Sequence, residues 1–311
     1  MPEATASFSE GLQHILKKAL SLLRPDLAEA GRVSMAMTAA ALLVSVLQTF
    51  SGPAKSASDF AGAAAIASVM LLSTNSLVSL ASDTLRELTQ YGKLLMPVMT
   101  AALAAQGGIT SSGALYAGTA LFTSLLSTAV TRLLIPFVYL FLALSVINAA
   151  LAADSLKKLK DLLKGFVSWV LKTLLTVFTT YMGITGILSG NTDAAALKAA
   201  KVTISTFVPV VGGILSDASE AVLVSVSLAR SAAGLYGIFA ILALFLEPFC
   251  RIGSHYLLLK LTSAFSGLFG TKAMSELIGD FSAAMGLLLG MTGSVCLMQL
   301  ISTVCFLKGV G

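Results

Sequence analysis

Charged residues are scarce in this chain. They make up 11% of its 311 residues, whereas hydrophobic residues make up 56%, and the mean hydropathy is +0.90. A soluble domain carries roughly 25% charged residues, so this composition indicates a membrane protein. The apolar runs lack strand alternation and exceed the roughly 10 residues of a membrane barrel strand. We therefore expect an all-α, polytopic transmembrane helical bundle without a sizeable soluble domain.

Cysteine and histidine are too few and too scattered for a metal site. The three cysteines, Cys250, Cys296 and Cys305, lie in or beside apolar segments and show neither CxxC nor Cys/His spacing. The two histidines, His14 and His255, stand far apart in the sequence. We expect free thiols in the core and no bound metal.

Motifs for catalysis are also missing. The chain contains no Gly-x-Ser-x-Gly turn, no phosphate-binding Gly-x-x-x-x-Gly-Lys-Ser/Thr loop and no acid pair joined by histidine. The net charge of +5 is spread over the segments between apolar runs and does not form a basic stripe with aromatics. We expect neither an enzyme, nor a cofactor, nor a nucleic-acid partner.

Six apolar segments are long enough, or nearly so, to cross a bilayer, which takes roughly 20 residues. They are residues 33–50, 60–81, 133–153, 166–188, 231–246 and 281–307. Amphipathic helices on the membrane surface are predicted at 7–24 and 154–164, a polar connector at 82–93, and a mainly interfacial helix at 249–279. Residues 257–269 are the alternative seventh span.

The segment 202–229 predicts a re-entrant hairpin, because its apolar pieces are too short to span. Pro209, Gly212 and Gly213 interrupt the helix before a polar tip that carries Asp217 and Glu220. These acids are three residues apart, hence on one helical face, and suit a cation site, a proton relay or a basic partner. The alternative is that Asp217 caps a helix at an exposed tip and Glu220 is solvated.

A similar interruption occurs at residues 94–130, which predict a first hairpin. Its helix-breaking residues are Pro97, Gly107 and Gly108, and its polar tip supplies Gln106, Thr110 and Ser111 as candidates to line a transport path. Arg132 and Arg230 each follow a hairpin; they are candidates to meet the opposite hairpin's acids, with snorkelling to lipid head groups as the alternative.

The two hairpin segments are similar in sequence and predict an internal repeat. Residues 95–103 (LMPVMTAAL) resemble residues 207–215 (FVPVVGGIL), an offset of about 112 residues, although Leu/Ala-rich segments also resemble one another by chance. The predicted organisation is an N-terminal interfacial helix at 1–32, two spans at 33–93, repeat unit 1 at 94–190 and repeat unit 2 at 191–311. Each unit makes an even number of crossings, so the repeat would be parallel.

Several segments resemble the stage III sporulation protein AE family. They are residues 206–218 (TFVPVVGGILSDA), 104–111 (AAQGGITS), 171–178 (LKTLLTVF) and 199–202 (AAKV). The resemblance implies a multi-pass component of the mother-cell membrane facing the forespore, within a channel or feeding apparatus. It implies other stage III sporulation proteins as partners, in addition to membrane lipid and possible further copies of the chain.

Two functions follow as hypotheses. The first is a subunit of a sporulation-associated channel or transport complex that moves small solutes between mother cell and forespore, with the hairpin tips lining the path. The alternative is a non-conducting membrane scaffold that assembles other stage III sporulation proteins.

Overall fold

The computed structural model describes residues 8–50, 55–105, 109–151, 154–187, 232–269 and 272–308, and all of them are helical. The elements are α1 (Phe8–Phe50), α2 (Lys55–Ala105), α3 (Ile109–Ala129), the π-helical turn η2 (Val130–Leu134), α4 (Ile135–Leu151), α5 (Asp154–Ile187), α8 (Ala232–Phe269) and α9 (Lys272–Lys308). The predicted all-α fold is therefore confirmed for the described residues. The second predicted hairpin, at 202–229, lies outside them.

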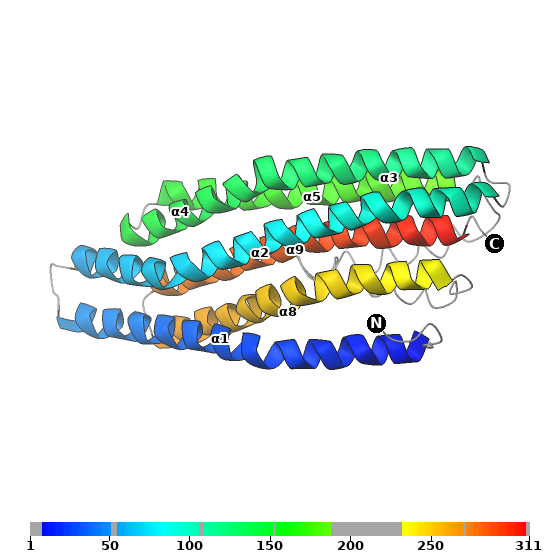
Figure 1. Cartoon of the computed structure of the whole chain (residues 1–311). Helices are drawn as coiled ribbons and strands as arrows, with labels where there is room; N and C mark the ends of the chain where they lie inside the picture. The colour runs from blue at the N-terminus through cyan, green and yellow to red at the C-terminus, as the bar shows by residue number, and fades with distance from the viewer. Residues whose placement is uncertain are drawn as a thin grey trace.

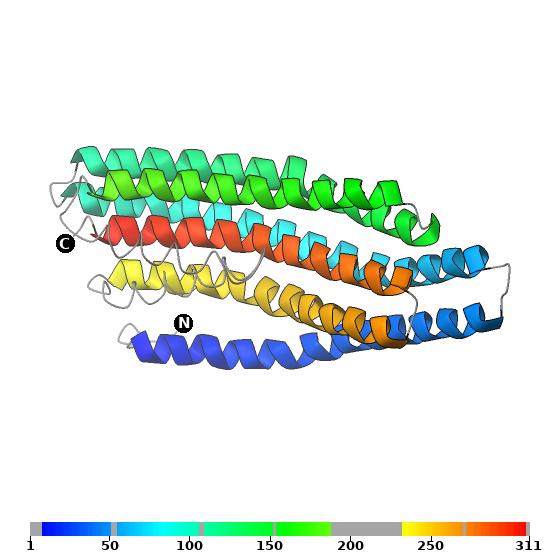
Figure 2. The same cartoon turned by 180° about the vertical axis from the view of Figure 1, so that it is seen from behind.

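The helices lie side by side in one elongated bundle (Figure 1). Helix α9 occupies its centre and packs against α8, α2, α4, α5 and α3, as the opposite view also shows (Figure 2). Helix α1 lies at the periphery, where it packs mainly against α8 and α2. Of the apolar stretch of α9, 94% is buried inside the protein, against 17% for α1. The core of the molecule is thus arranged around its last helix.

Six helical stretches of the described chain are long and apolar enough to cross a membrane. Each of the six predicted spans overlaps a different one of them; 33–50, 60–81 and 281–307 lie wholly inside, whereas 133–153, 166–188 and 231–246 extend past the ends. The helices are nevertheless much longer than the predicted spans: α1 has 43 residues and α2 has 51. At 1.5 Å per residue they extend about 64 and 76 Å, roughly twice the ~30 Å hydrocarbon core of a bilayer.

The helices continue through the polar segments that were predicted to separate the spans. Residues 82–93, expected as a connector, lie inside α2, and residues 8–24 and 154–164, expected as separate helices, are continuous with the rest of α1 and α5. In α2 the side chains of Leu85 and Leu88 are fully buried, while Asp83, Arg86 and Glu87 are exposed. An apolar stripe on the core side therefore maintains the helix where its outer face is charged.

Pro97, predicted to break the helix of the first hairpin, lies inside α2 without ending it. Helix α2 continues to Ala105 and α3 begins at Ile109, so the described parts of this hairpin belong to long helices. The expected interfacial segment 249–279 is likewise divided between α8 and α9. Pro97 removes only one backbone hydrogen-bond donor, and α2 stays helical on both sides of it because its other residues pack against the bundle.

The element η2 joins α3 to α4 with one extra residue per turn. The N–H of Ile135 donates to the carbonyl of Val130, the i to i+5 bond of a π-helix. Val130 and Leu134 are buried on either side of the turn. The bulge therefore keeps both α3 and α4 facing the core without breaking the helix.

Gly118 allows α3 and α5 to approach closely. A Cβ at this position would overlap the ring of Tyr181, whose hydroxyl donates to the carbonyl of Ala114 at 2.9 Å. The ring also packs 5.7 Å from that of Phe122, so it has little freedom to move away. Close approach of the two helices thus depends on glycine.

We expect Gly118→Ala to lower the free energy of unfolding by about 1–3 kcal/mol, as overpacking usually does. The measurement is an unfolding titration in detergent micelles. Gly113→Ala on the same helix is the matched control, because a Cβ there meets nothing within 4 Å. It should be neutral or slightly stabilising, because alanine favours helix over glycine. Equal stability of the two variants would contradict the described packing.

Candidate functional site

Ionisable side chains gather between α1 and α8, about halfway along both helices. The helices run parallel: Gly11 approaches Phe239 near their starts, and Glu29 pairs with Arg251 further along. We call Asp26, Glu29, Glu247, Arg251 and His255 the α1–α8 ionic cluster. Its α8 members are spaced four residues apart, which places them on one helical face.

The contacts of the cluster centre on Arg251. Its Nη2 lies 3.3 Å from Oε1 of Glu29, in an ion pair whose side chains are 29% and 38% exposed. Asp26 interacts electrostatically with Arg251, Glu29, Glu247 and His255. The cluster thus combines three acids, one arginine and one histidine within a contact between two largely apolar helices.

Three buried polar atoms of the cluster have no hydrogen-bond partner among the described residues: Oδ2 of Asp26, Nε of Arg251 and Nε2 of His255. The His255 side chain is completely buried, and its Nδ1 lies 2.9 Å from the carbonyl oxygen of Arg251. A carbonyl only accepts, so Nδ1 carries the hydrogen and Nε2 is an acceptor in the neutral ring. The site therefore offers two hydrogen-bond acceptors, on Asp26 and His255, which could take up a proton. Together with the donor on Arg251 they could also bind a small polar solute.

A second group of charges connects α5 to α9. The ammonium of Lys160 pairs with the carboxylate of Asp280, and their side chains are only 4% and 20% exposed. One helical turn away, Lys157 lies 3.4 Å from Glu276 in a more exposed pair. The basic segment 154–164, predicted as a surface helix, is therefore docked on the central helix.

Helix α9 also carries buried polar side chains further along. The hydroxyl of Thr119 on α3 donates to that of Ser302 at 3.0 Å. Thr292, Ser294 and Thr303 each donate to the carbonyl four residues earlier in α9. A hydroxyl that donates to a carbonyl of its own helix is satisfied without water or a ligand. This region therefore acts as a packed core and not as an open path.

Most of the predicted site residues cannot be placed by the structure. Arg132 is exposed in η2, Pro97 is exposed in α2, and Thr110 and Ser111 belong to the first turn of α3. The others lie outside the described residues: Gln106, Gly107, Gly108, Pro209, Gly212, Gly213, Asp217, Glu220 and Arg230. Whether the two hairpin tips lie close together therefore stays a prediction.

Sequence reasoning missed the α1–α8 ionic cluster. The predicted elements place Asp26 and Glu29 between the helix at 7–24 and the span at 33–50, and Arg251 and His255 in the interfacial segment 249–279. The repeat of ionisable residues at 247, 251 and 255 was the available signal, because it marks one helical face. Among the described residues no group of three or more metal-ligating side chains could hold an ion.

Six long apolar helical stretches of the described chain, one of them the buried central helix α9, with ion pairs inside the bundle, define a polytopic helical membrane protein. Residues 3–309 match the family model described as "Stage III sporulation protein AE (spore_III_AE)", so the chain belongs to this family. The predicted resemblance is confirmed.

A curated relative, "Stage III sporulation protein AE" of Bacillus subtilis (strain 168), is 23% identical over 199 residues, which cover 63% of this chain and 50% of the relative. The chain thus matches about half the length of that protein. No solved structure matches the chain.

Proposed function

We propose that the protein is an integral membrane subunit of a sporulation-associated channel or transport complex that moves small solutes between mother cell and forespore. The α1–α8 ionic cluster is the observation that carries this proposal. Ionisable groups between membrane helices are costly and commonly mark ion, proton or substrate pathways. The buried, unpartnered atoms of Asp26, Arg251 and His255 give this pathway both donors and acceptors.

The proposal places the chain in the mother-cell membrane facing the forespore. Its partners would be membrane lipid, other stage III sporulation proteins of the same assembly and further copies of itself. The membership of the stage III sporulation protein AE family supports this setting. We propose no catalytic role for the chain.

The re-entrant hairpins and the parallel internal repeat belong to the same proposal. The sequence predicts that Gln106, Asp217 and Glu220 line the path at the hairpin tips. In the proposed complex these tips and the α1–α8 ionic cluster would contribute to one polar route, together with neighbouring subunits.

A non-conducting scaffold is the second candidate, and the packing of α9 favours it. This helix is 94% buried along its apolar stretch, and most of its hydroxyls bond within the bundle. A solid bundle of this kind suits a subunit that positions others. The two functions differ in what they require of the cluster, because only transport needs its charges.

We expect the double variant Asp26→Asn, Glu29→Gln to abolish most spore formation while the complex still assembles. Both substitutions remove charge and nearly preserve side-chain volume, so the α1–α8 contact should persist. The measurements are the yield of heat-resistant spores in a complemented endospore-forming host and the recovery of stage III partners with the tagged protein.

Asp83→Asn on α2 is the matched control, because this carboxylate is exposed and lies outside the cluster. It should leave both measurements unchanged. Normal spore yield from the double variant would refute transport through the cluster. Parallel loss of spores and of partner recovery would instead support the scaffold.

A further inference from the structure

The α1–α8 ionic cluster carries an excess of negative charge. Its carboxylates on Asp26, Glu29 and Glu247 are accompanied by the single guanidinium of Arg251, and the neutral ring of His255 adds no charge. Three negative groups and one positive group leave two negative charges in excess. Uncompensated charge between largely apolar helices is costly. The cluster is therefore suited to a ligand that brings positive charge.

The arrangement of the cluster does not suit a metal ion. Among the described residues, no group of three or more histidine, cysteine, aspartate or glutamate side chains could hold one. The ion pair of Arg251 with Glu29 already compensates one carboxylate, so the excess charge lies on Asp26 and Glu247. A proton binds to a single atom and needs no convergence of several ligands. The cluster therefore fits a proton better than a metal ion.

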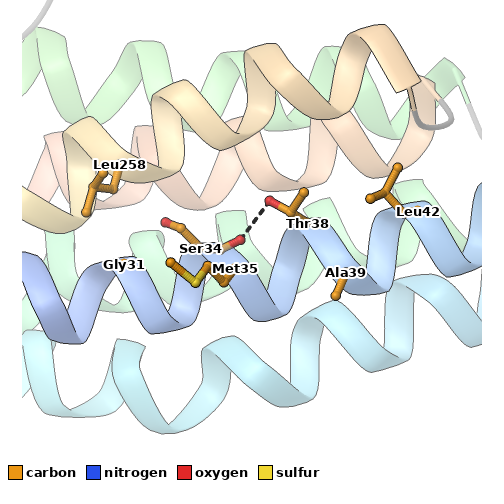
Figure 3. A pocket seen from close by; sticks show the side chains of 7 residues that line it. All are labelled: Gly31, Ser34, Met35, Thr38, Ala39, Leu42 and Leu258. Carbon is orange, nitrogen blue, oxygen red and sulfur yellow. Dashed lines mark hydrogen bonds between the residues drawn. The ribbon is translucent and has the colours of Figure 1, made fainter.

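The unpartnered atoms of the cluster also leave no room for a larger cation. They are buried, and the His255 side chain is completely so. A shallow groove beside the same helix pair lies further along (Figure 3). Its lining residues extend from Gly31 to Leu42 on α1 and include Leu258 of α8, but none of them belongs to the cluster. A proton occupies no volume beyond that of the atom that binds it.

His255 is the acceptor best suited to take up this proton. Its Nδ1 donates to the carbonyl of Arg251 at 2.9 Å, and its Nε2 has no hydrogen-bond partner in the described part of the chain. Histidine is the side chain whose charge changes nearest neutral pH. Uptake transfers a proton from a hydronium ion to Nε2, which leaves water and turns the ring into an imidazolium. The carboxylate of Asp26, which interacts electrostatically with His255, balances the new charge.

The groups that interact electrostatically with Asp26 lie on α1 and α8: Glu29, Glu247, Cys250, Arg251 and His255. Helices α2 and α9 also pack against α8, but they contribute none of these groups.

The carboxylates of α9 and α2 are engaged or exposed elsewhere. On α9, Glu276 and Asp280 pair with lysines of α5. On α2, the side chains of Asp83 and Glu87 are exposed. The balance of charge at the site is therefore set between α1 and α8.

We propose that the ion bound by the α1–α8 ionic cluster is a proton, held on Nε2 of His255 and balanced by the Asp26 carboxylate. This proton site rests on the proposed transport function and names the ion of that route. Proton uptake reduces the excess negative charge between the two helices from two to one. The contact between α1 and α8 is therefore more stable in the protonated state than in the unprotonated one.

Solid-state nitrogen NMR of the full chain, with isotope-labelled histidine in phosphatidylcholine vesicles, tests the proposal. The chain has two histidines, so His14→Gln removes the exposed one and leaves His255 as the reporter. Its ring should be neutral with the hydrogen on Nδ1 at about pH 9 and an imidazolium at about pH 5. In the same background, Asp26→Asn should weaken proton binding about tenfold or more, because a nearby carboxylate stabilises the imidazolium.

Glu29→Gln should also weaken proton binding, because it removes a negative charge and leaves Arg251 unpaired. It keeps the test decisive if Asp26→Asn does not fold. Asp83→Asn is the matched control, because this exposed carboxylate lies outside the cluster, and it should leave proton binding unchanged. A wild-type ring that stays neutral down to about pH 4 would overturn the proposal. Wild-type proton affinity in both Asp26→Asn and Glu29→Gln would overturn it as well.

The spectra report proton binding to the chain itself, whereas the yield of spores reports transport by the complex. A ring that titrates as expected, together with normal spore yield from Asp26→Asn, Glu29→Gln, would support the proton site and refute transport through the cluster. A ring that stays neutral, together with lost spore yield and intact assembly, would overturn the proton site and leave the transport proposal with another solute.

Discussion

Lys160→Ala is expected to lower the free energy of unfolding by about 3–5 kcal/mol, the usual cost of removing one partner of a buried ion pair. The Lys160 side chain is only 4% exposed and its ammonium pairs with Asp280 on the central helix. Truncation would leave the Asp280 carboxylate, between α5 and α9, with only the Ser145 hydroxyl and the charge of Lys164 to compensate it. The measurement is a denaturant titration of the protein in detergent micelles, followed by circular dichroism.

Lys157→Ala is the matched control for this prediction. Its ion pair with Glu276 lies one turn away, with side chains 50% and 33% exposed, so its loss should cost at most about 1 kcal/mol. The double variant Lys160→Met, Asp280→Leu should be close to wild type, because an apolar pair also avoids a lone buried charge. If Lys160→Ala is no less stable than Lys157→Ala, the inferred cost of a lone Asp280 carboxylate is wrong.

Phe178→Ala is expected to lower the free energy of unfolding by about 3–5 kcal/mol, the range for removing a large buried aromatic side chain. Phe178 is completely buried and lies edge-to-face with Phe122, at a ring centroid distance of 5.6 Å. Its removal leaves a cavity between α3 and α5 whose lining loses van der Waals contacts. The same titration in micelles measures the effect.

Val177→Ala provides the comparison for Phe178, because Val177 precedes it in α5 but is 51% exposed. Its side chain faces lipid or detergent, so its truncation creates no internal cavity. We expect a change within about 0.5 kcal/mol, as for surface substitutions generally. A similar loss in both variants would indicate that this side of α5 is not packed against α3.

The sequence predicted the class of fold and the six spans because long apolar runs have few alternatives in a membrane protein. It did not predict that the helices continue through the charged segments. The mean hydropathy of residues 82–93 marks the segment as polar. Leu85 and Leu88 nevertheless form a buried stripe on one face of the helix. Whether such a stripe is covered depends on the neighbouring helix, which the sequence alone does not identify.

The candidate site was harder to predict than the fold, because its contacts join distant parts of the chain. Glu29 and Arg251 are 222 residues apart, and Lys160 and Asp280 are 120 apart. Local patterns showed that these residues are charged but not that they meet. Glycine and proline around Gln106 and Asp217 predict polar hairpin tips, and the role of these tips as a transport path stays a prediction.

The π-helical turn η2 affects how related sequences should be aligned. A π-turn is in effect an α-helix with one inserted residue, and deleting that residue restores regular geometry. Deletion of Thr131 would therefore leave the residues after it on the same face relative to α3, because the wider turn compensates for the extra residue. Phe141 and Leu142, now buried, would stay on the core face. Homologues without the insertion should show a one-residue gap here and an unchanged apolar pattern in the following helix.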